Sequence, residues 1–383
     1  RYASRGLGDV YKRQQYVYAI PLCILPLIIK SFFDKIVAFV SVIITLLIIS
    51  FMVPNSHEFV YLNMVTGIFA SLTSDDLYRR AKLFTSVGII YLLYIFSYLA
   101  FVLISDGNFT NFNLEILLMF TLNCFATLFV QPLTYIFEKL FGLVSDASLL
   151  ELTDTNNKIL RELENKAPGT FHHSLQVANL AETAANAVGA NTLLTRVGAL
   201  YHDIGKIKNP VFYSENQSNY NPHDNLEPVE SKDIIIEHVK NGVLLAKKFN
   251  LPERIIDFIK SHHGTTTVLY FFHKQSLINK NVKIETFKYP GPKPHSKETS
   301  IVMIADGVEA TSKSLKSPNL ENIKQLVDKV TSRLMEENQF IDATITLKDI
   351  QIVKKVITDK LVSSFQLRVE YPENNENKSN MLK

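Results

Sequence analysis

The chain has 383 residues, of which 47% are apolar, with 14 glycines and 14 prolines. This length predicts two or three domains, and the composition excludes a disordered or collagen-like chain. A net charge of +3, from 40 basic and 37 acidic residues, is too small to indicate a nucleic-acid polymer as a partner. Two cysteines without a CxxC motif exclude a disulfide scaffold and a thiolate zinc site.

The first 14 residues, RYASRGLGDVYKRQ, are basic and do not begin with Met. We interpret residues 1–14 as a non-native scar of cloning or sequence assembly and leave them out of the fold prediction. On this interpretation the natural protein would continue upstream, with an extracellular part before the first span.

Residues 15–137 are predicted to form a membrane domain with about five transmembrane helices. Its five apolar segments are residues 16–29, 36–53, 58–72, 84–104 and 113–136. The second and fourth are long and uncharged enough to cross a hydrocarbon core of about 30 Å. The first and third are shorter, so they either cross a locally thinned bilayer or form buried or re-entrant helices. Cys23 and Cys124 lie in such segments and are interpreted as packing residues.

The charges of the loops predict how this domain is oriented. The loops after the first and third spans contain five basic residues, namely Lys30, Lys35, Arg79, Arg80 and Lys82. The loops at residues 54–58 and 105–113 contain no Lys or Arg. Because basic loops stay in the cytoplasm, we expect a multi-pass protein of the cell membrane whose residues after about 140 are cytoplasmic.

The second half of the chain differs, since 9 of the 10 histidines follow position 170. Residues 138–167 are charged, with leucines spaced as in an amphipathic helix, and predict a helical connector that is either a surface helix or a signal-transmitting stalk. Residues 168–372 have a helical pattern, and residues 373–383 form a polar tail that we expect to be disordered. The predicted fold class is therefore all-α, with a polytopic helical membrane domain before a cytoplasmic all-α bundle.

The first predicted helix of the bundle has a histidine on its apolar face. Thr170 is its expected N-cap and Phe171 its first residue. His173 lies on the inward stripe of apolar residues. His172 points about 100° away, toward solvent or a neighbouring helix.

Four further helices bring histidines or aspartates toward the same interior. We expect the first of them to run from Asn191 to Gly205, the next to begin near Ser231 and the next to open with Pro252. The polar residues that the four carry are His202, Asp203, His238, His262, His263 and Asp306. Burying these imidazoles and carboxylates without partners would be costly, whereas a metal cluster would satisfy all of them. Ligands that are all N or O suit Fe, Mn or Zn, and two ions can share seven ligands.

These seven residues, in this order and spacing, resemble the H…HD…D signature of the HD phosphohydrolase superfamily and the added histidines of its two-metal branch. The strings YHDIGK, ENQSNYNPHD and SHHGTTT are similar to the cytoplasmic HD domain of the seven-transmembrane HD family, bacterial membrane phosphodiesterases that hydrolyse cyclic di-AMP. The resemblance covers residues 130–372 closely and the spans more loosely. Members have an extracellular domain and seven spans, so this chain would retain the last five. Gln366 stands where a family histidine is expected.

The resemblance implies a role for each metal ligand. One ion would be held by His173, His202, Asp203 and Asp306, and the other by Asp203, His238, His262 and His263. The cofactors would be two divalent ions, Mn or Fe, which activate a hydroxide for in-line attack on the phosphate. Asp203 would be catalytic as the bridge between them, and Lys206 would place a positive charge on the scissile phosphate unless it is an exposed helix-end lysine.

The polar segment 213–224 is predicted to be a loop that faces the substrate. The residues expected to bind the substrate there, or to support the ligands through hydrogen bonds, are Glu215, Asn216, Gln217 and His223. His273 and His295 flank or lie within the basic segment 280–297 and are expected to be exposed.

The predicted function is that of a membrane-anchored, metal-dependent phosphodiesterase that converts cyclic di-AMP to linear pApA. No GYP motif follows His262 and His263, which argues against the cyclic di-GMP enzymes of the superfamily. Hydrolysis of ppGpp or another nucleotide remains open, because metal ions recognise the phosphate and not the base, as does a non-catalytic nucleotide receptor. The expected partners are the cyclic dinucleotide, the lipid bilayer and a second copy of the chain in a homodimer.

Overall fold

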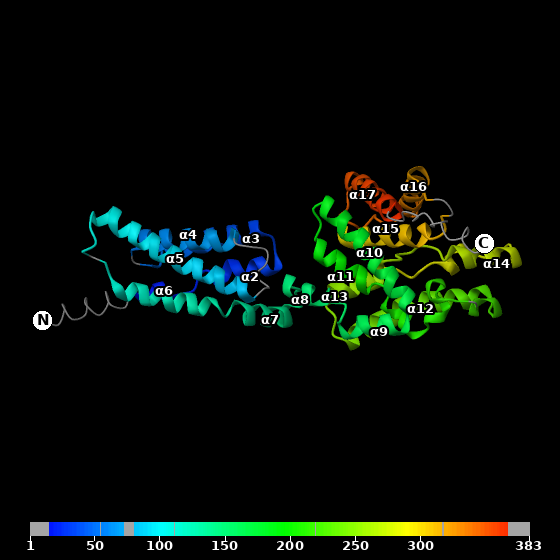
Figure 1. Cartoon of the computed structure of the whole chain (residues 1–383), viewed down its shortest axis with the longest axis horizontal. Coiled ribbons are helices and arrows are strands. Elements are labelled where there is room, and N and C mark those ends of the chain that lie inside the picture. Colours follow the sequence, from blue (N-terminus) through cyan, green and yellow to red (C-terminus); the bar gives the residue numbers. More distant parts are fainter. Residues whose placement is uncertain are drawn as a thin grey trace, which may run out of the picture. The chain divides into compact units, whose positions relative to one another are not determined.

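The computed structural model describes residues 15–53, 55–72, 80–110, 112–218, 220–315 and 318–366. Within these ranges the regular structure is helical, and one isolated antiparallel bridge joins Thr267 and Lys288. The all-α prediction is therefore confirmed (Figure 1). The chain divides into two compact units, Arg1–Leu149 and Leu150–Lys383. The predicted scar at 1–14 and the predicted tail at 373–383 lie outside the described residues.

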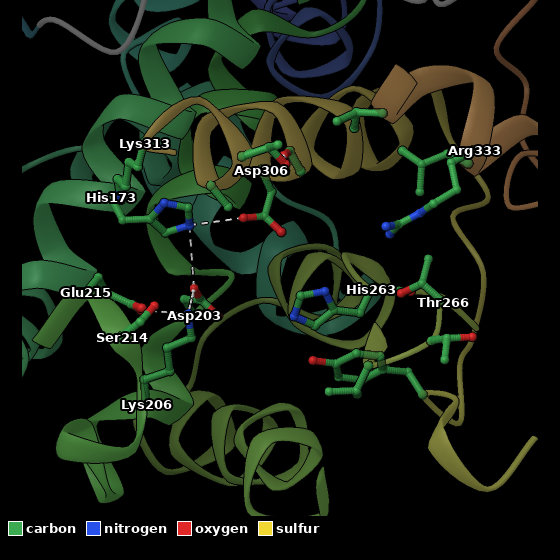
Figure 2. Close-up of a pocket in the computed structure, with 18 residues that line it drawn as sticks. His173, Asp203, Lys206, Ser214, Glu215, His263, Thr266, Asp306, Lys313 and Arg333 are labelled. Atoms are coloured by element: carbon green, nitrogen blue, oxygen red, sulfur yellow. Dashed lines mark hydrogen bonds and ion pairs between the residues drawn. The ribbon is translucent and has the colours of Figure 1, made fainter. Parts of the chain in front are cut away.

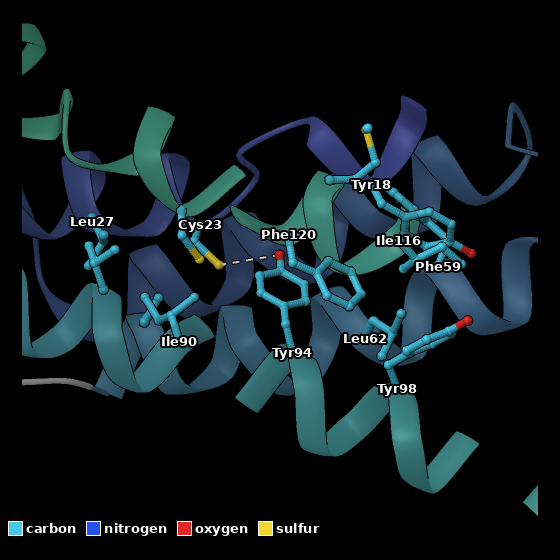
Figure 3. Packing of buried hydrophobic residues seen from close by; sticks show 14 of the residues in the cluster. Tyr18, Cys23, Leu27, Phe59, Leu62, Ile90, Tyr94, Tyr98, Ile116 and Phe120 are labelled. Atoms are coloured by element: carbon cyan, nitrogen blue, oxygen red, sulfur yellow. Dashed lines mark hydrogen bonds between the residues drawn. The ribbon is translucent and has the colours of Figure 1, made fainter. Parts of the chain in front are cut away.

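The first unit is a group of apolar helices around an aromatic core. Its elements are η1 (Gln15–Ala19), α2 (Ile24–Phe32), α3 (Lys35–Ser50), α4 (Ser56–Leu72), α5 (Arg80–Asp106), α6 (Leu114–Thr127) and α7 (Val130–Phe141). The Tyr94 ring stacks on Phe120 with centroids 4.8 Å apart, and its hydroxyl donates to Asn63 (Figure 3). Cys23 is buried beside Tyr94, as expected of a packing residue.

Two helical stretches among the described residues are long and apolar enough to cross a bilayer, Gln15–Phe32 and Ala81–Asp106. A third arises if α6 and α7, which are bent by 42°, form one broken span. The expected fifth span is thus two helices, because Pro132 has no backbone N–H and its ring clashes with the carbonyl four residues earlier. Since α3 is apolar but shorter, the total of five spans stays a prediction.

The connector is helical but broken into pieces. Helix α7 ends at Gly142, whose φ of 64° is left-handed, and α8 (Asp146–Leu152) and α9 (Lys158–Lys166) follow. The boundary between the two units falls inside α8, and α9 packs on α10 within the second unit. The second half of the connector is therefore part of the bundle.

The second unit is a helical bundle in which α10 contacts α9, α11, α15 and α17 (Figure 1). Its longer helices are α10 (Pro168–Ala187), α11 (Thr192–Tyr201), α12 (Pro228–Lys248), α13 (Glu253–Ser261), α14 (Leu269–Ile278), α15 (Lys297–Ser312), α16 (Leu320–Glu336) and α17 (Leu347–Gln366). Short 3₁₀ turns join α11 to α12: η2 (Ile204–Lys208), η3 (Pro210–Phe212), η4 (Ser214–Asn216) and η5 (Pro222–Asn225). A further turn, η6 (Ile284–Phe287), precedes α15.

Two helix ends differ from the sequence prediction. Helix α10 begins at Pro168, so Thr170 is not its N-cap and lies buried inside the helix. Proline is favoured in the first turn, where its missing N–H costs nothing. Helix α11 begins after its N-cap Asn191, as expected, but ends before Gly205. Gly205 is needed for close packing instead, because a Cβ there would lie 1.8 Å from the His238 carbonyl oxygen.

Two further helix starts are shifted by a few residues. Helix α12 begins at Pro228, earlier than the expected start near Ser231, because Glu227 and Glu230 form a capping box. Pro252 is the N-cap of α13 and not its first residue. These shifts leave the inward faces of the helices as predicted.

Candidate metal centre

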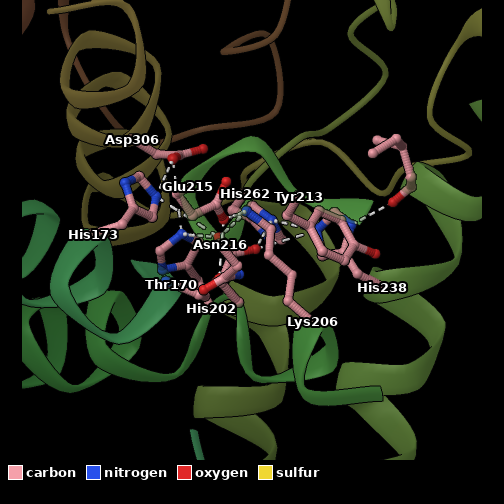
Figure 4. Close-up of polar contacts among 12 residues, drawn as sticks. Thr170, His173, His202, Lys206, Tyr213, Glu215, Asn216, His238, His262 and Asp306 are labelled. Carbon is pink, nitrogen blue, oxygen red and sulfur yellow. Dashed lines mark hydrogen bonds and ion pairs between the residues drawn. The ribbon is translucent and has the colours of Figure 1, made fainter. Parts of the chain in front are cut away.

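The seven predicted metal ligands converge in the second unit, although they come from separate helices. Figure 4 labels His173, His202, His238, His262 and Asp306. His173 lies on α10, His202 and Asp203 directly follow α11, His238 lies on α12, His262 and His263 directly follow α13, and Asp306 lies on α15. All except His263 are at most 8% exposed. Such burial requires each polar atom to have a partner.

Asp203 lies between two groups of imidazoles. Its Oδ2 is 3.3 Å from His202 Nε2 and 3.7 Å from His173 Nε2. Its Oδ1 is 3.3 Å from His238 Nε2 and 3.6 Å from His262 Nε2. The two oxygens of one carboxylate therefore face two different sets of nitrogen atoms.

Asp306 and His263 complete these two sets. Asp306 Oδ1 is 3.0 Å from His173 Nε2. The His263 ring lies beside His262, with centroids 4.0 Å apart. Two groups of potential ligand atoms each fall within 4.8 Å: Asp203, His238, His262 and His263 in one, and His173, His202 and Asp203 in the other. The arrangement corresponds to two adjacent cation sites that share Asp203.

Backbone carbonyls orient three of the imidazoles. Each Nδ1 donates to a carbonyl of its own helix: that of Ala199 for His202, of Ile235 for His238 and of Ile259 for His262. The proton on Nδ1 leaves Nε2 with a free lone pair directed at the centre of the site. Such outer hydrogen bonds fix the tautomer and the orientation of metal-binding histidines.

Two buried polar atoms at this centre have no hydrogen-bond partner within the described part of the chain and could instead coordinate cations. His202 Nε2 and Asp203 Oδ1 are buried without a hydrogen-bond partner among the described residues. Nε2 of His238 and Nε2 of His262 lie 3.1 Å apart although neither carries a proton in this tautomer. Lone pairs that face one another in a buried site are costly unless a positive charge lies between them. The residues present therefore fit a pair of divalent ions.

The ligand histidines differ in protonation. Burial acts to lower the pKa of His202, but the carboxylates of Asp203 and Asp306 outweigh it and raise this pKa to about 10, so a cation bound there would displace a proton. Burial lowers the pKa of His238 to about 3, and burial together with His262 and His238 holds the pKa of His263 well below its usual value. Both imidazoles are therefore neutral, as ligation requires. Burial opposes ionisation of Asp203, but Lys206 and His202 outweigh it and hold the pKa of this carboxyl well below its usual range.

Lys206 lies inside the site, so its interpretation as an exposed helix-end lysine is wrong. Its Nζ is 2.7 Å from Asp203 Oδ2 and 2.8 Å from Glu215 Oε1, and its side chain is 12% exposed. Burial acts to lower the pKa of Lys206, but the two carboxylates raise it well above its usual value. The ammonium group is therefore a permanent positive charge beside the bridging aspartate.

A pocket of about 540 Å³ opens over the site (Figure 2). His173, Asp203, His263 and Asp306 line it together with Lys206 and Glu215. Thr266, Thr267 and Arg333 line the side nearer to α16, and Lys313 lies near His173. The volume is within the range of pockets for small-molecule ligands. Three cations, Lys206, Lys313 and Arg333, line it together with three carboxylates, Asp203, Glu215 and Asp306.

Of the four residues predicted to bind the substrate, one lines the pocket and three do not. Glu215 lines the pocket, and its Oε1 accepts from the Thr170 hydroxyl. Asn216 is tied to the same threonine through its Oδ1 and Nδ2. Gln217 and His223 are outside the pocket lining and bond to their own loop. A role for these four residues in substrate binding stays a prediction.

Three supporting residues were not singled out in the sequence. Tyr289 stacks on His263 with ring centroids 4.2 Å apart. Gln339 Oε1 accepts from the Thr265 N–H at 2.9 Å and so holds the turn after the histidine pair. Glu309 faces the His173 ring. Only Glu309 could have been identified from the sequence, because it lies one helical turn after the predicted ligand Asp306 and therefore on the same face of α15.

Three histidines of the second unit were expected to lie away from the metal centre. His172, His273 and His295 are exposed. The side chain of Gln366, which stands where a family histidine was expected, lies outside the described residues. None of these three histidines lines the pocket or belongs to the two ligand groups.

Both units match known families. The family described as 7TM receptor with intracellular HD hydrolase matches residues 3–145, and the HD domain family matches residues 170–311. The cyclic-di-AMP phosphodiesterase PgpH of Bacillus subtilis is 36% identical over 366 residues, 93% of this chain and 51% of that protein. PgpH of Listeria monocytogenes is 34% identical over 367 residues, 94% of this chain and 51% of that protein. The chain thus spans about half the length of these curated relatives.

A solved structure supports the match of the second unit. The crystal structure of the L. monocytogenes PgpH HD domain in complex with cyclic di-AMP is 42% identical, with a TM-score of 0.54. The similarity covers 56% of this chain and 99% of that one. An apolar helical unit that matches the membrane domain is followed by a bundle that carries the HD residues. The chain is therefore a membrane protein that belongs to the seven-transmembrane HD family of the HD phosphohydrolase superfamily.

Proposed function

We propose that this protein is a membrane-anchored, metal-dependent phosphodiesterase that hydrolyses cyclic di-AMP to linear pApA. The observation that carries the proposal is the pair of ligand groups around Asp203, a residue that also lines the pocket. The PgpH relatives bear the name of this activity, and one HD domain has been solved with cyclic di-AMP.

Two divalent ions, Mn²⁺ or Fe²⁺, are the proposed cofactors. One set of ligands is His173, His202, Asp203 and Asp306, and the other is Asp203, His238, His262 and His263. Nitrogen and oxygen donors without sulfur suit these metals. When bound, such a pair supplies an activated water as nucleophile and neutralises charge on the phosphate.

The protein's own groups prepare the pocket for a phosphodiester. Asp203 stays ionised because Lys206 lies 2.7 Å from its Oδ2. The Lys206 ammonium is also placed at the pocket wall, where it can donate to a non-bridging phosphate oxygen as negative charge develops. Glu215 Oε1 holds this ammonium from the other side at 2.8 Å and limits its rotation.

The proposed location is the bacterial cell membrane, with the second unit in the cytoplasm. The basic loop residues Lys30, Lys35 and Lys82 support this orientation through the positive-inside rule. A soluble nucleotide would then reach the pocket from the cytoplasm. Assembly of two chains into a homodimer stays a prediction.

The decisive experiment is the Asp203→Asn substitution in the full chain, purified in detergent and supplied with Mn²⁺. We expect the wild type to release pApA and the variant to lose its activity by roughly 10³-fold or more, because the shared charge that holds both ions is gone. Product chromatography measures the rate, and elemental analysis measures bound Mn. Asp342→Asn, at an exposed position, should behave as the wild type. An active Asp203→Asn protein would contradict the proposal.

A substrate panel separates this function from its alternatives. Cyclic di-AMP, cyclic di-GMP and ppGpp are compared at equal concentration by product chromatography. Equal rates on all three would remove the cyclic di-AMP assignment and leave the phosphohydrolase chemistry in place. Binding of a nucleotide by the Mn-loaded protein without any product would favour the receptor alternative.

A further inference from the structure

Glu309 is a buried carboxylate that is not a predicted metal ligand. It lies on α15 one turn after Asp306 and is 5% exposed. Its Oε2 is within hydrogen-bond distance of His173 Nδ1. Its Oε1 is 3.0 Å from Lys313 Nζ at the edge of the pocket. Burying a carboxylate is costly unless its charge is paired and hydrogen-bonded, and both of its oxygens have a partner here.

His173 differs in this respect from three other histidines of the site. Nδ1 of His202, of His238 and of His262 donates to a backbone carbonyl, which is neutral and fixed by its helix. Nδ1 of His173 donates to a charged side chain from a different helix. The orientation of His173 therefore depends on a residue that a substitution can remove, whereas that of the other three does not.

Helix α15 holds the His173 ring at both nitrogen atoms. Asp306 Oδ1 is 3.0 Å from Nε2, on the side of the metal site, and Glu309 lies at Nδ1 on the opposite side. A carboxylate at Nδ1 keeps the proton there, turns the Nε2 lone pair toward the ion and increases the basicity of the ring.

We propose that Glu309 is a positioning residue for one ion of the pair, the ion held by His173, and that the ion held by His238, His262 and His263 does not depend on it. This inference rests on the proposed two-metal function. It adds that the histidines of the two ions are oriented by different hydrogen-bond partners, a side-chain carboxylate for His173 and backbone carbonyls for His238 and His262. Loss of the Glu309 charge should weaken the first site by roughly 10–100-fold, the usual effect of removing such a partner of a metal ligand.

The test is Mn²⁺ titration of the full chain by calorimetry, with elemental analysis of the desalted protein and Mn²⁺ electron paramagnetic resonance. The wild type should bind two ions per chain and show the spectrum of a coupled pair. Glu309→Gln should retain one ion with unchanged affinity, bind the second roughly 10–100-fold more weakly, and show an uncoupled ion at low loading. His173→Gln should give the same pattern.

Two variants control this experiment. Glu298→Gln changes the same residue type on the same helix, where Glu298 accepts from the Asn191 N–H outside the pocket lining, and it should bind two ions as the wild type does. Glu309→Asp restores the charge with a shorter side chain and should recover part of the lost affinity. It also provides a test if Glu309→Gln does not fold.

The other outcomes distinguish a wrong role for Glu309 from a wrong proposed function. Two ions bound to Glu309→Gln with wild-type affinity would overturn the inference, and so would equal weakening of both ions in a folded variant. A wild type that binds two ions without hydrolysing a nucleotide would refute the proposed function and leave the role of Glu309 intact. A wild type that cannot be loaded with metal would overturn both.

Discussion

Lys206 occupies an environment that few lysines have. Two carboxylates, Asp203 and Glu215, lie within 2.8 Å of its ammonium group, and the side chain is 12% exposed. A lysine on a flexible stem would lose conformational entropy on binding a phosphate, but these contacts have already ordered the side chain. The charge is therefore preorganised at the pocket wall.

Replacing Lys206 with methionine tests this role. The variant should retain both ions, because no ligand is changed, while kcat on cyclic di-AMP falls by roughly 10²–10³-fold through loss of one charged donor to the transition state. Steady-state kinetics and elemental analysis give the two readouts. Lys208→Met, at a side chain that is 56% exposed, is the matched control. An unchanged kcat in Lys206→Met would contradict a catalytic contact.

Residue identity and spacing were informative for the predicted ligands and less so for the residues around them. His173 and Asp306 were predicted correctly as inward residues, because helical periodicity places them on apolar faces. Thr170 was wrongly predicted as a cap, since Pro168 starts the helix earlier. Thr170 instead holds the pocket residue Glu215, a contact between residues 45 positions apart.

At the scale of elements, α15 is the helix on which the site depends most. It carries Asp306, Glu309 and Lys313 at spacings of three and four residues, so that all three lie on one face. A capping box caps the N-terminus of α15. Thr299 N donates to Ser296 Oγ at 3.1 Å, and Ser296 N donates to Thr299 Oγ1 at 3.1 Å. The cap fixes where the helix begins and so supports the register of that face.

Ser296→Ala removes half of this box. We expect the second unit to lose about 1 kcal/mol of stability, the typical contribution of an N-cap side chain, with little change in kcat of the folded protein. Denaturant unfolding followed by circular dichroism measures the loss. Ser314→Ala is the control, because the Ser314 hydroxyl donates to the Thr311 carbonyl at an exposed position after the helix. Equal stability of the two variants would show that the cap contributes nothing.

At the scale of the whole molecule, all seven ligands lie in the second of two compact units. An ion that binds only the folded site stabilises that unit by mass action. The ligands come from α10, α12 and α15 and from the segments after α11 and α13, so the ions should join most of the bundle into one cooperative structure. The first unit contributes no residue to this ligand set.

Metal removal should therefore affect the two units differently. At a free Mn²⁺ concentration of about 100 times the Kd, the second unit should gain about 2.7 kcal/mol for each ion that it binds, and EDTA should reverse this gain. Scanning calorimetry in detergent should show the transition of the second unit rise with Mn²⁺ while that of the membrane unit stays constant. A Mn²⁺-dependent shift of both transitions would contradict independent units. Mg²⁺ at equal concentration, which prefers oxygen ligands, is a suitable control.

The sequence by itself determined the helical class, the apolar and histidine-rich halves and the seven polar residues that converge in the second unit. These features are encoded locally, by hydrophobic runs, by the period of 3.6 residues and by residue types that bind metal. The resemblance to the seven-transmembrane HD family then implied how the ligands divide between two ions and which reaction they would support.

Only the tertiary structure decided which residues support the predicted ligands. Glu309 meets His173 across 136 positions, and Gln339 meets Thr265 across 74. Such contacts depend on how whole helices pack, because no local pattern relates residues so far apart in the chain. For the same reason the sequence left Lys206 open between a contact with the scissile phosphate and an exposed helix-end lysine, whereas the structure places its ammonium group between Asp203 and Glu215.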